Sequence, residues 1–323
     1  MMNARVCAAL ILLTATAPIA QAQPAYPTKP IRMIVPYPPS GGNDILGRFV
    51  ADKLTEKLGQ QVVVDNRGGA STSIGAEIAA RAPVDGYTIF LATVTTLAVN
   101  PNLNAKLPYD ADRDFSPVSM LASQPYLLVS HPSLKLKTVN DLIALAKAKP
   151  GALNFASPGV GSNGHLAGEL INSMAGIKMV HIGYKGTGPA INDLMGGHVP
   201  IMIATLPSVE SHVKAGRITG LGVSTLKRSS IMPAVPTISE SGISGYSMRS
   251  WNGLMVPRKV EAQVVTRLNR EVNEVLTHPE NVKRLTALGF DPDPGTPAEF
   301  AAFIKQELDL YAKVVKAAGL QKN

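Results

Sequence analysis

Three glycine-rich loops could bind a small anion, because each follows a strand pattern and precedes a helical one. The first is Ser40-Gly41-Gly42-Asn43, a few residues after the apolar run 31–35. Free backbone N–H groups and the helix dipole attract an anion at such a helix start. Gly41 and Gly42 let the backbone approach a ligand closely, and the Ser40 hydroxyl adds a donor. The alternative is a tight strand-to-helix turn that needs glycine only for its torsion angles.

The second loop, residues 156–165, matches the pattern G-x-G-x-x-G at its three glycines, Gly159, Gly161 and Gly164. That pattern suggests a dinucleotide site, which also needs an acidic residue about 20 positions later to hold a ribose. The segment at that place, MVHIGYKG, contains no Asp or Glu. We therefore reject a dinucleotide site and expect no cofactor. The loop instead predicts a second anion cradle that faces the first, with Ser157 and Ser162 as side-chain donors.

The third loop, residues 183–189, offers backbone amides and the Thr187 hydroxyl, which suit a carboxylate. Lys185 in the same loop is expected to point into solvent, as most lysines do. Further hydroxyl groups follow two other strand patterns: Thr93, Thr95 and Thr96 after the third strand, and Thr205 after VPIMIA. Ligands of open α/β sheets lie at the carboxyl ends of the strands, so we expect Thr93 and Thr205 near the loops.

A periplasmic hydrolase is the alternative function, because Ser162, His165 and Asp193 supply the residue types of a catalytic triad. The spacing argues against it, since the chain has no G-x-S-x-G elbow and Ser162 and His165 are only three positions apart at one helix start. His165 is more simply explained by packing or ligand contact. The other histidines form no H-x-x-x-H pair and have no cysteine partners, so no metal site is expected.

The first set of elements that must position these loops alternates β-branched runs with helical patterns between residues 31 and 93. The segments are IRMIVPY, ILGRFVADKLTEKLG, QVVVDN, IGAEIAARA and YTIFLAT. This rhythm predicts a parallel sheet covered by helices. Asn43 or Asp44 can cap the first helix, and Gly59 ends it. The apolar stripe of this helix comprises Ile45, Leu46, Phe49, Val50, Leu54 and Leu58.

A second α/β set follows Asp114. Its strands are PYLLVSH, LNFAS, MVHIGYK and VPIMIAT, and its helices are expected over 139–148, 165–174 and 190–194. After ITGLGVST and a segment rich in proline and glycine come the strand WNGLMVP and two terminal helices, the last with a capping box at 296–299. The C-terminal part has no core of its own and is expected to return to the first lobe. This predicts lobe one as 23–123 and 229–323, lobe two as 124–228, two crossovers, and a hinged cleft.

The N-terminus predicts an exported protein. Arg5, the apolar run 6–13 and the site Ala20-Gln21-Ala22 form a signal peptide, residues 1–22, with cleavage after Ala22 and the periplasm as destination. Cys7, the single cysteine, lies inside it, so no disulfide is expected. Loss of Arg5 changes the formal charge from +8 to +7. The basic residues are scattered and aromatics are few, which excludes a nucleic-acid binder and leaves a diffuse field that favours anionic ligands.

Seven segments in order resemble the receptors of tripartite tricarboxylate transporters, the TctC-like or Bug-type family. They are YPTKPIRMIVPYPPSGGNDILGR, VVVDNR, APVDGYT, LPYDADRDFSPV, LNFASPGVGSNGHLAGEL, YKGTGPAINDLMGG and PAVPTISESG with SWNGLMVP. The resemblance implies a type II periplasmic-binding-protein fold, also called a Venus flytrap. It implies a solute receptor, not an enzyme. Such a receptor binds a small organic acid and serves membrane transporter subunits or a sensor domain. We expect a monomer. The ligand-binding residues implied are Ser40, Gly41, Gly42, Asn43, Thr93, Ser157, Gly159, Gly161, Ser162, His165, Thr187 and Thr205.

The chain departs from the pattern of this family at two positions that matter for the ligand. Ser40 replaces the usual glycine of the first loop, which adds a hydroxyl and removes backbone freedom. Ala204 stands where relatives often have Asp. A buried ammonium group needs an anionic partner, so the loss of that carboxylate disfavours an amino acid. The expected ligand is a dicarboxylate or an aromatic or other organic acid.

Overall fold

The computed structural model of the protein describes residues 26–320 and residue 322. The predicted signal peptide, residues 1–22, and its cleavage site lie outside this part of the chain. Within it, none of the helices combines the length and the apolar character needed to cross a membrane.

The helices and strands follow the chain in three groups. The first comprises β1 (Ile31–Val35), α1 (Gly42–Leu58), β2 (Val62–Asn66), α2 (Ser73–Ala80), β3 (Thr88–Thr93), the π-helix η1 (Thr95–Val99) and α3 (Asn100–Leu103). The second comprises β4 (Phe115–Ser130), the 3-10 helix η2 (Pro132–Leu134), α4 (Val139–Ala148), β5 (Asn154–Ser157), α5 (Asn163–Ala175), β6 (Val180–Gly183), α6 (Thr187–Met195), β7 (Ile201–Thr205), α7 (Leu206–Lys214) and β8 (Thr219–Val223). The third comprises β9 (Arg249–Pro257), α8 (Ala262–Thr277), α9 (Pro279–Ala287), β10 (Asp291–Pro292) and α10 (Pro297–Ala317).

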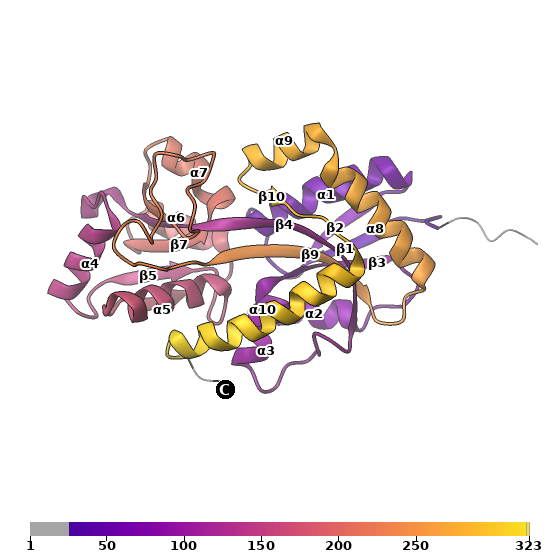
Figure 1. The fold of residues 1–323 in the computed structure, drawn as a ribbon, viewed down its shortest axis with the longest axis horizontal. Helices are drawn as coiled ribbons and strands as arrows, with labels where there is room; N and C mark the ends of the chain where they lie inside the picture. Colours follow the sequence, from indigo (N-terminus) through magenta and orange to yellow (C-terminus); the bar gives the residue numbers. More distant parts are fainter. Residues whose placement is uncertain (1–25, 321, 323) are drawn as a thin grey trace, which may run out of the picture.

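The strands pair in the order β2-β1-β3-β9-β4-β7-β5-β6, with β8 and β10 also paired to β4. Two parallel sets, β1 to β3 and β5 to β7, define lobe one and lobe two. The antiparallel strands β4 and β9 lie between them and run from one half of the molecule towards the other (Figure 1). β4 pairs with β9 as far as Pro125 and with β7 from Tyr126 onwards. The prediction of two α/β lobes joined by two crossovers is confirmed.

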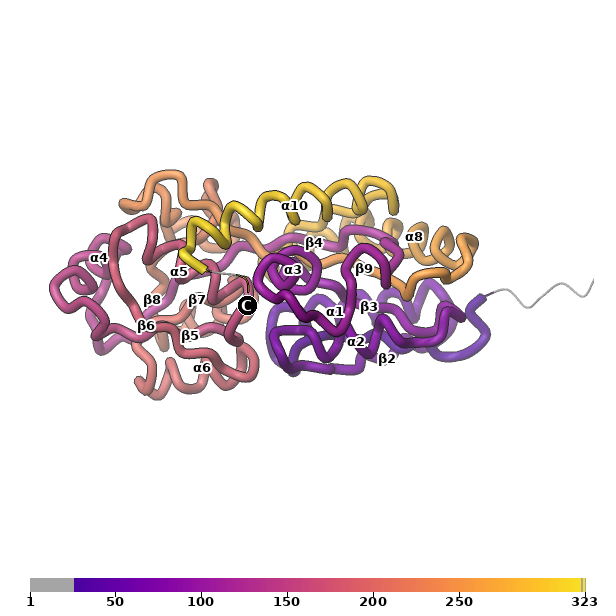
Figure 2. Tube along the Cα trace, turned by 90° about the horizontal axis from the view of Figure 1, so that it is seen from below, coloured from indigo at the N-terminus to yellow at the C-terminus, as the bar shows by residue number. Residues whose placement is uncertain are grey.

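Each lobe has a buried apolar core beside the shared sheet. In lobe one, the predicted stripe of α1, including Leu46 and Leu54, packs with β1 and with α8. In lobe two, α6 and α7 cover β7 in a separate cluster. A third cluster continues from lobe one into lobe two and contains Trp251, Phe155 and Tyr311. α10 lies along this cluster and reaches α5 of lobe two, as Figure 2 shows, so the last helix spans both lobes.

Several elements differ from the expectation drawn from the sequence, beyond the short elements η1, α3, η2 and β10, which were not predicted. The C-terminal part contains three helices and not two, because Pro279 cannot continue α8 and instead begins α9. β4 starts at Phe115, well before the predicted PYLLVSH; Pro117 lies at a register shift, where a strand tolerates proline. α7 was not predicted, since it has only nine residues and opens with a proline in its first turn.

The predicted lobe boundaries, 23–123 with 229–323 and 124–228, stay a prediction. Residues 229–248 pack on elements of lobe two: Ile238 donates its backbone N–H to Val223, and Tyr246 donates its hydroxyl to the carbonyl of Ala167. These contacts favour a return to lobe one at the start of β9, near Arg249.

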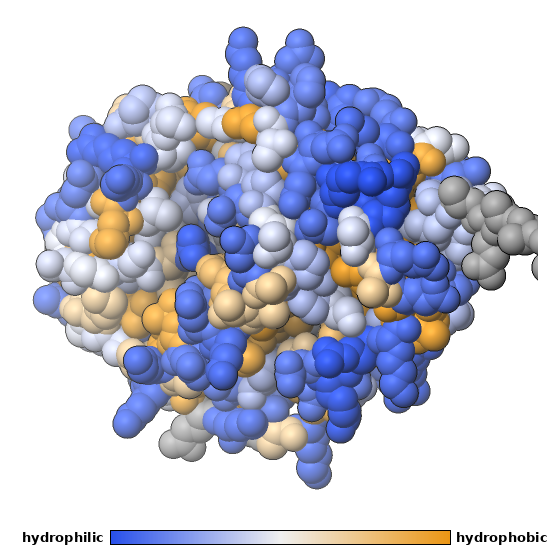
Figure 3. Space-filling view, turned by 45° about the vertical axis from the view of Figure 1, so that its right-hand side comes forward, coloured by the Kyte–Doolittle hydropathy of each residue, from blue (hydrophilic) through white to orange (hydrophobic). Residues whose placement is uncertain are grey.

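The surface of the face drawn in Figure 3 is mostly hydrophilic, with small apolar patches that polar residues separate. Separate apolar side chains of this kind are ordinary at a surface in contact with water.

Candidate ligand-binding site

The first loop joins β1 to α1 and brings Gly41 and Gly42 against lobe two. Gly41 is the N-cap of α1, and a Cβ on it would lie 3.3 Å from Thr187 Oγ1. A Cβ on Gly42 would lie 2.7 Å from Thr205 Oγ1, closer than real Cβ atoms approach. The N–H of Gly42 donates to Ser208 Oγ at 2.9 Å. The predicted glycines therefore meet the predicted threonines of the other lobe.

The two residues that flank these glycines have partners within lobe one. Ser40 is exposed and has a left-handed φ of 76°, and its N–H donates to Asp44 Oδ2 at 3.0 Å. The side chain of Asn43 accepts a hydrogen bond from Asn252 Nδ2 at 2.7 Å. Burial opposes ionisation of Asp44, but hydrogen bonds from Arg48, Ser40 and other groups lower the pKa of its carboxyl. The Ser40 N–H and the Asn43 side chain are thus engaged within lobe one.

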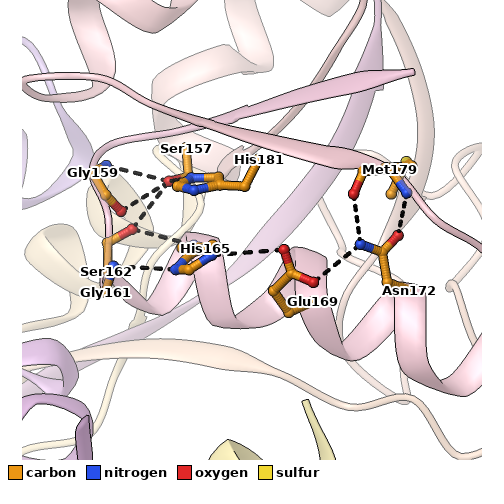
Figure 4. A network of polar contacts seen from close by, with 9 residues as sticks. All are labelled: Ser157, Gly159, Gly161, Ser162, His165, Glu169, Asn172, Met179 and His181. Atoms are coloured by element: carbon orange, nitrogen blue, oxygen red, sulfur yellow. Dashed lines mark hydrogen bonds and ion pairs between the residues drawn. The ribbon is translucent and has the colours of Figure 1, made fainter. Parts of the chain in front are cut away.

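The second loop has several polar contacts within its own lobe (Figure 4). Ser162 is the N-cap of α5, and its Oγ accepts the N–H of His165 at 3.2 Å. His165 Nδ1 in turn accepts the N–H of Gly161 at 3.1 Å. Ser157 Oγ lies 2.6 Å from His181 Nε2, which fixes the other side of the loop. The structure brings all the predicted residues of this loop together.

His165 of this loop and His181 of β6 stack face to face, with ring centroids 3.8 Å apart. Burial, together with the neighbouring His165, lowers the pKa of His181 to about 4. Burial opposes ionisation of Glu169, yet the nearby His165 ring and a hydrogen bond from Asn172 lower the pKa of that carboxyl. Because His165 Nδ1 accepts the N–H of Gly161, Nε2 is the ring nitrogen that can donate, and it faces Glu169 Oε1 at 3.6 Å. His181 is therefore neutral at ordinary pH.

The geometry does not form the triad of a hydrolase. His165 points Nδ1 at Gly161 and Nε2 at Glu169, while the Ser162 hydroxyl lies near Ser157 Oγ at 3.3 Å. Asp193 accepts the hydroxyl of Tyr184 at 2.8 Å and so orients a different side chain. Within the part of the chain that the structure describes, no group of three His, Cys, Asp or Glu side chains could hold a metal.

A cavity of about 800 Å³ opens between the lobes next to these loops. Its walls are residues 36–39 and 68–72 of lobe one and 158–161 and 183–186 of lobe two. This volume lies within the usual range for small-molecule sites. Of the predicted residues, Gly159, Gly161 and His165 line it, whereas Gly41, Gly42, Thr187 and Thr205 lie in the contact behind it. Lys185 is exposed at its rim.

Several functional candidates were missed in the sequence, or ranked below their neighbours. Thr93 is buried in a hydroxyl network with Thr96, whereas Thr95 Oγ1 accepts both the Tyr37 hydroxyl and the N–H of Asn163 from lobe two, each at 3.2 Å. Gln124 lies buried on β4 where the strand changes lobes. A polar residue beside apolar strand residues, as in SQPYLLV, was the available signal for Gln124.

Comparison with known proteins gives consistent results. A model of the family described as "Tripartite tricarboxylate transporter family receptor" matches residues 46–320. The chain is 35% identical to Rpa4515 of R. palustris, solved with adipate, with a TM-score of 0.90 over 92% of this chain and 100% of that one. It is 30% identical to the periplasmic binding protein BugD (TM-score 0.88; 92% and 100% covered). It is 27% identical to MatC of Rhodopseudomonas palustris with bound malate (TM-score 0.85; 90% and 100% covered).

Proposed function

The chain belongs to the tripartite tricarboxylate transporter receptor family, and we propose that it captures a dicarboxylate or another small organic acid between its lobes. Receptors of this family are periplasmic solute-binding proteins, not enzymes. They bind small carboxylates and work with transporter components. The fold is the type II periplasmic-binding-protein fold that the sequence predicts.

The observation that carries the proposal is the meeting of helix N-termini from both lobes at Gly41 and Gly42. α1 begins here in lobe one, and α6 and α7 begin at Thr187 and next to Thr205 in lobe two. Each helix start places partial positive charge and N–H groups without partners inside their own helix at the junction. A carboxylate bound there contacts both lobes only when they meet, so the ligand stabilises the closed form by its differential affinity.

The ligand class follows from the neutral donors of the junction and from the similar structures. Ala204 is fully buried beside Thr205, and its methyl group offers no partner to an ammonium group. The similar proteins Rpa4515 and MatC were solved with adipate and malate, both dicarboxylates. These points favour a dicarboxylate over an amino acid.

We further propose that the chain is exported to the periplasm and that its signal peptide is cleaved after Ala22. The mature protein acts as a monomer and delivers its ligand to membrane subunits of a transporter or to a sensor domain. The hydrolase alternative has no support, because the Ser162 hydroxyl caps α5 and His165 points elsewhere.

The proposal is tested by isothermal titration calorimetry and thermal shift with adipate, malate, benzoate and glutamate. We expect the dicarboxylates to bind and to raise the melting temperature, and glutamate to bind more weakly. X-ray scattering of the same samples should show compaction on binding if ligand-free protein samples an open form. If none of the acids binds, the receptor is not one for small carboxylates of this class.

A further inference from the structure

Gln124 is a buried polar side chain at the point where β4 passes from lobe one to lobe two. Its backbone faces Ser250 of β9, and two residues later Tyr126 faces Thr205 of β7. Only 1% of Gln124 is exposed. Neither Oε1 nor Nε2 has a hydrogen-bond partner among the described residues. A buried amide without partners is costly, and such a group in a native fold calls for a functional or structural reason.

The Gln124 amide points at the place where the start of α1 meets the start of α7. A Cβ on Gly42 would lie 3.2 Å from Gln124 Oε1 and 3.3 Å from its Nε2, beside Thr205 Oγ1. The other polar groups at this point are neutral: the Gly42 N–H donates to Ser208 Oγ, and Ser208 Oγ lies 2.7 Å from Thr205 Oγ1. Gln124 therefore converges with three groups that already link the lobes.

The nearest acidic side chain of α1 does not use the Gln124 amide. Asp44, in the first turn of α1, is buried, and its carboxylate accepts hydrogen bonds from Ser40, Arg48 and Asn66. The junction thus offers an amide donor, a helix N-terminus and two hydroxyls without a competing anion in contact with them. This set matches a carboxylate, with Gln124 Oε1 left to accept from a hydroxyl group.

We propose that Gln124 is a specificity-determining residue that hydrogen-bonds the ligand group lying nearest the hinge. The inference rests on the proposed function and adds the selection rule. Nε2 donates to a carboxylate oxygen, which also takes the Gly42 N–H that Ser208 accepts in the structure. An acid with a polar group at both ends hydrogen-bonds this amide at one end and the loops that line the cavity at the other. An aliphatic monocarboxylate leaves one of them unpaired, so it binds more weakly.

The test compares adipate, malate and hexanoate by calorimetry on the full mature protein and on Gln124→Leu. We expect Gln124→Leu to weaken adipate and malate at least tenfold and to change hexanoate less than threefold, which removes the preference. The matched control is Ser130→Ala, which deletes a buried, unpaired hydroxyl at the far end of the same strand and should leave every affinity unchanged.

Thermal unfolding separates a binding role from a structural one. If Gln124 serves the ligand, Gln124→Leu removes two unpaired polar atoms and the ligand-free protein melts at the same or a higher temperature. Should that variant fold poorly, Gln124→Glu replaces it, and its added charge is expected to weaken dicarboxylates more than a hundredfold. Unchanged dicarboxylate affinity in either folded variant overturns the role of Gln124. Absence of binding by the wild-type protein instead overturns the proposed function and this inference with it.

Discussion

The N-termini of α1 and α5 follow loops of the same glycine-rich kind, yet only α5 has a side-chain cap. α1 begins with Gly41, which has no side chain to cap the helix, and the Gly42 N–H reaches Ser208 of the other lobe. α5 begins with Ser162, which caps the helix, while His165 holds the loop from within lobe two. The first N–H of each helix donates to a hydroxyl of the opposite lobe, Gly42 to Ser208 and Asn163 to Thr95, but only α5 also has a side-chain cap from its own lobe. We infer that the first couples binding to closure and that the second provides a preformed surface.

The largest effect is expected at the first helix start. Gly42→Leu places a side chain where a Cβ already lies 2.7 Å from Thr205 Oγ1, so the lobes cannot meet and the ligand site is filled. Affinity for adipate should fall more than a hundredfold, or about 2.7 kcal/mol. The measurement is calorimetry, with X-ray scattering to follow closure.

Lys185→Ala is the control for that variant, because Lys185 is exposed at the rim of the cavity. Its affinity should stay within about twofold of wild type, since a solvated lysine contributes little to a contact. Near-normal binding by Gly42→Leu would show that the α1 start is only a turn, and the comparison of the two helix starts would then fail.

An intermediate effect is expected from the histidine pair of the second helix start. The pKa of His181 lies at about 4 in the fold and near its ordinary value, about 6.5, in the unfolded chain. The unfolded chain therefore binds more protons between these values. The stability that His181 contributes is present in full above about pH 6.5 and is lost as the pH falls towards 4. Because water reaches part of the ring, the loss should be about 1–2 kcal/mol.

Urea unfolding of the wild type and of His181→Gln at several pH values measures this effect. The substitution should flatten the profile between pH 6.5 and 4, because Gln does not titrate and can still bond Ser157. Asp and Glu residues elsewhere contribute equally to both proteins and cancel in the difference. A difference that does not vary with pH would assign the acid sensitivity to groups other than this pair.

The sequence predicts the strands and helices of both lobes well, because hydrophobic periodicity reports which face of a segment is buried. It also predicts that Gly41, Ser162 and Thr205 follow strands at one edge of each sheet. It does not predict that Gly42 pairs with Ser208, however, because that pairing depends on how the lobes meet. Contacts between segments 166 residues apart leave no local pattern.

Two further residues show the same limit. Ser40 is exposed and has a left-handed backbone, which the sequence did not predict, because torsion angles of single residues are not encoded in composition. Its expected role as a donor to the ligand stays a prediction. Thr95 was noted beside Thr93, yet the π-helix η1 decides which hydroxyl reaches lobe two. Such local irregularities are resolved only by the packed structure.

The smallest effect is expected from removing the cap of α5. Ser162→Ala loses the hydrogen bond to the N–H of His165 and should lower the free energy of unfolding by about 1 kcal/mol. The matched variant Thr296→Ala removes the cap of α10, far along the chain from the loops, and should cost a similar amount. If backbone amides form the second anion cradle, as we propose, adipate affinity should change less than tenfold in Ser162→Ala and not at all in Thr296→Ala. If Ser162→Ala instead lost affinity a hundredfold at equal stability, the Ser162 hydroxyl would bind the ligand directly. The start of α5 would then contribute as much to affinity as the start of α1.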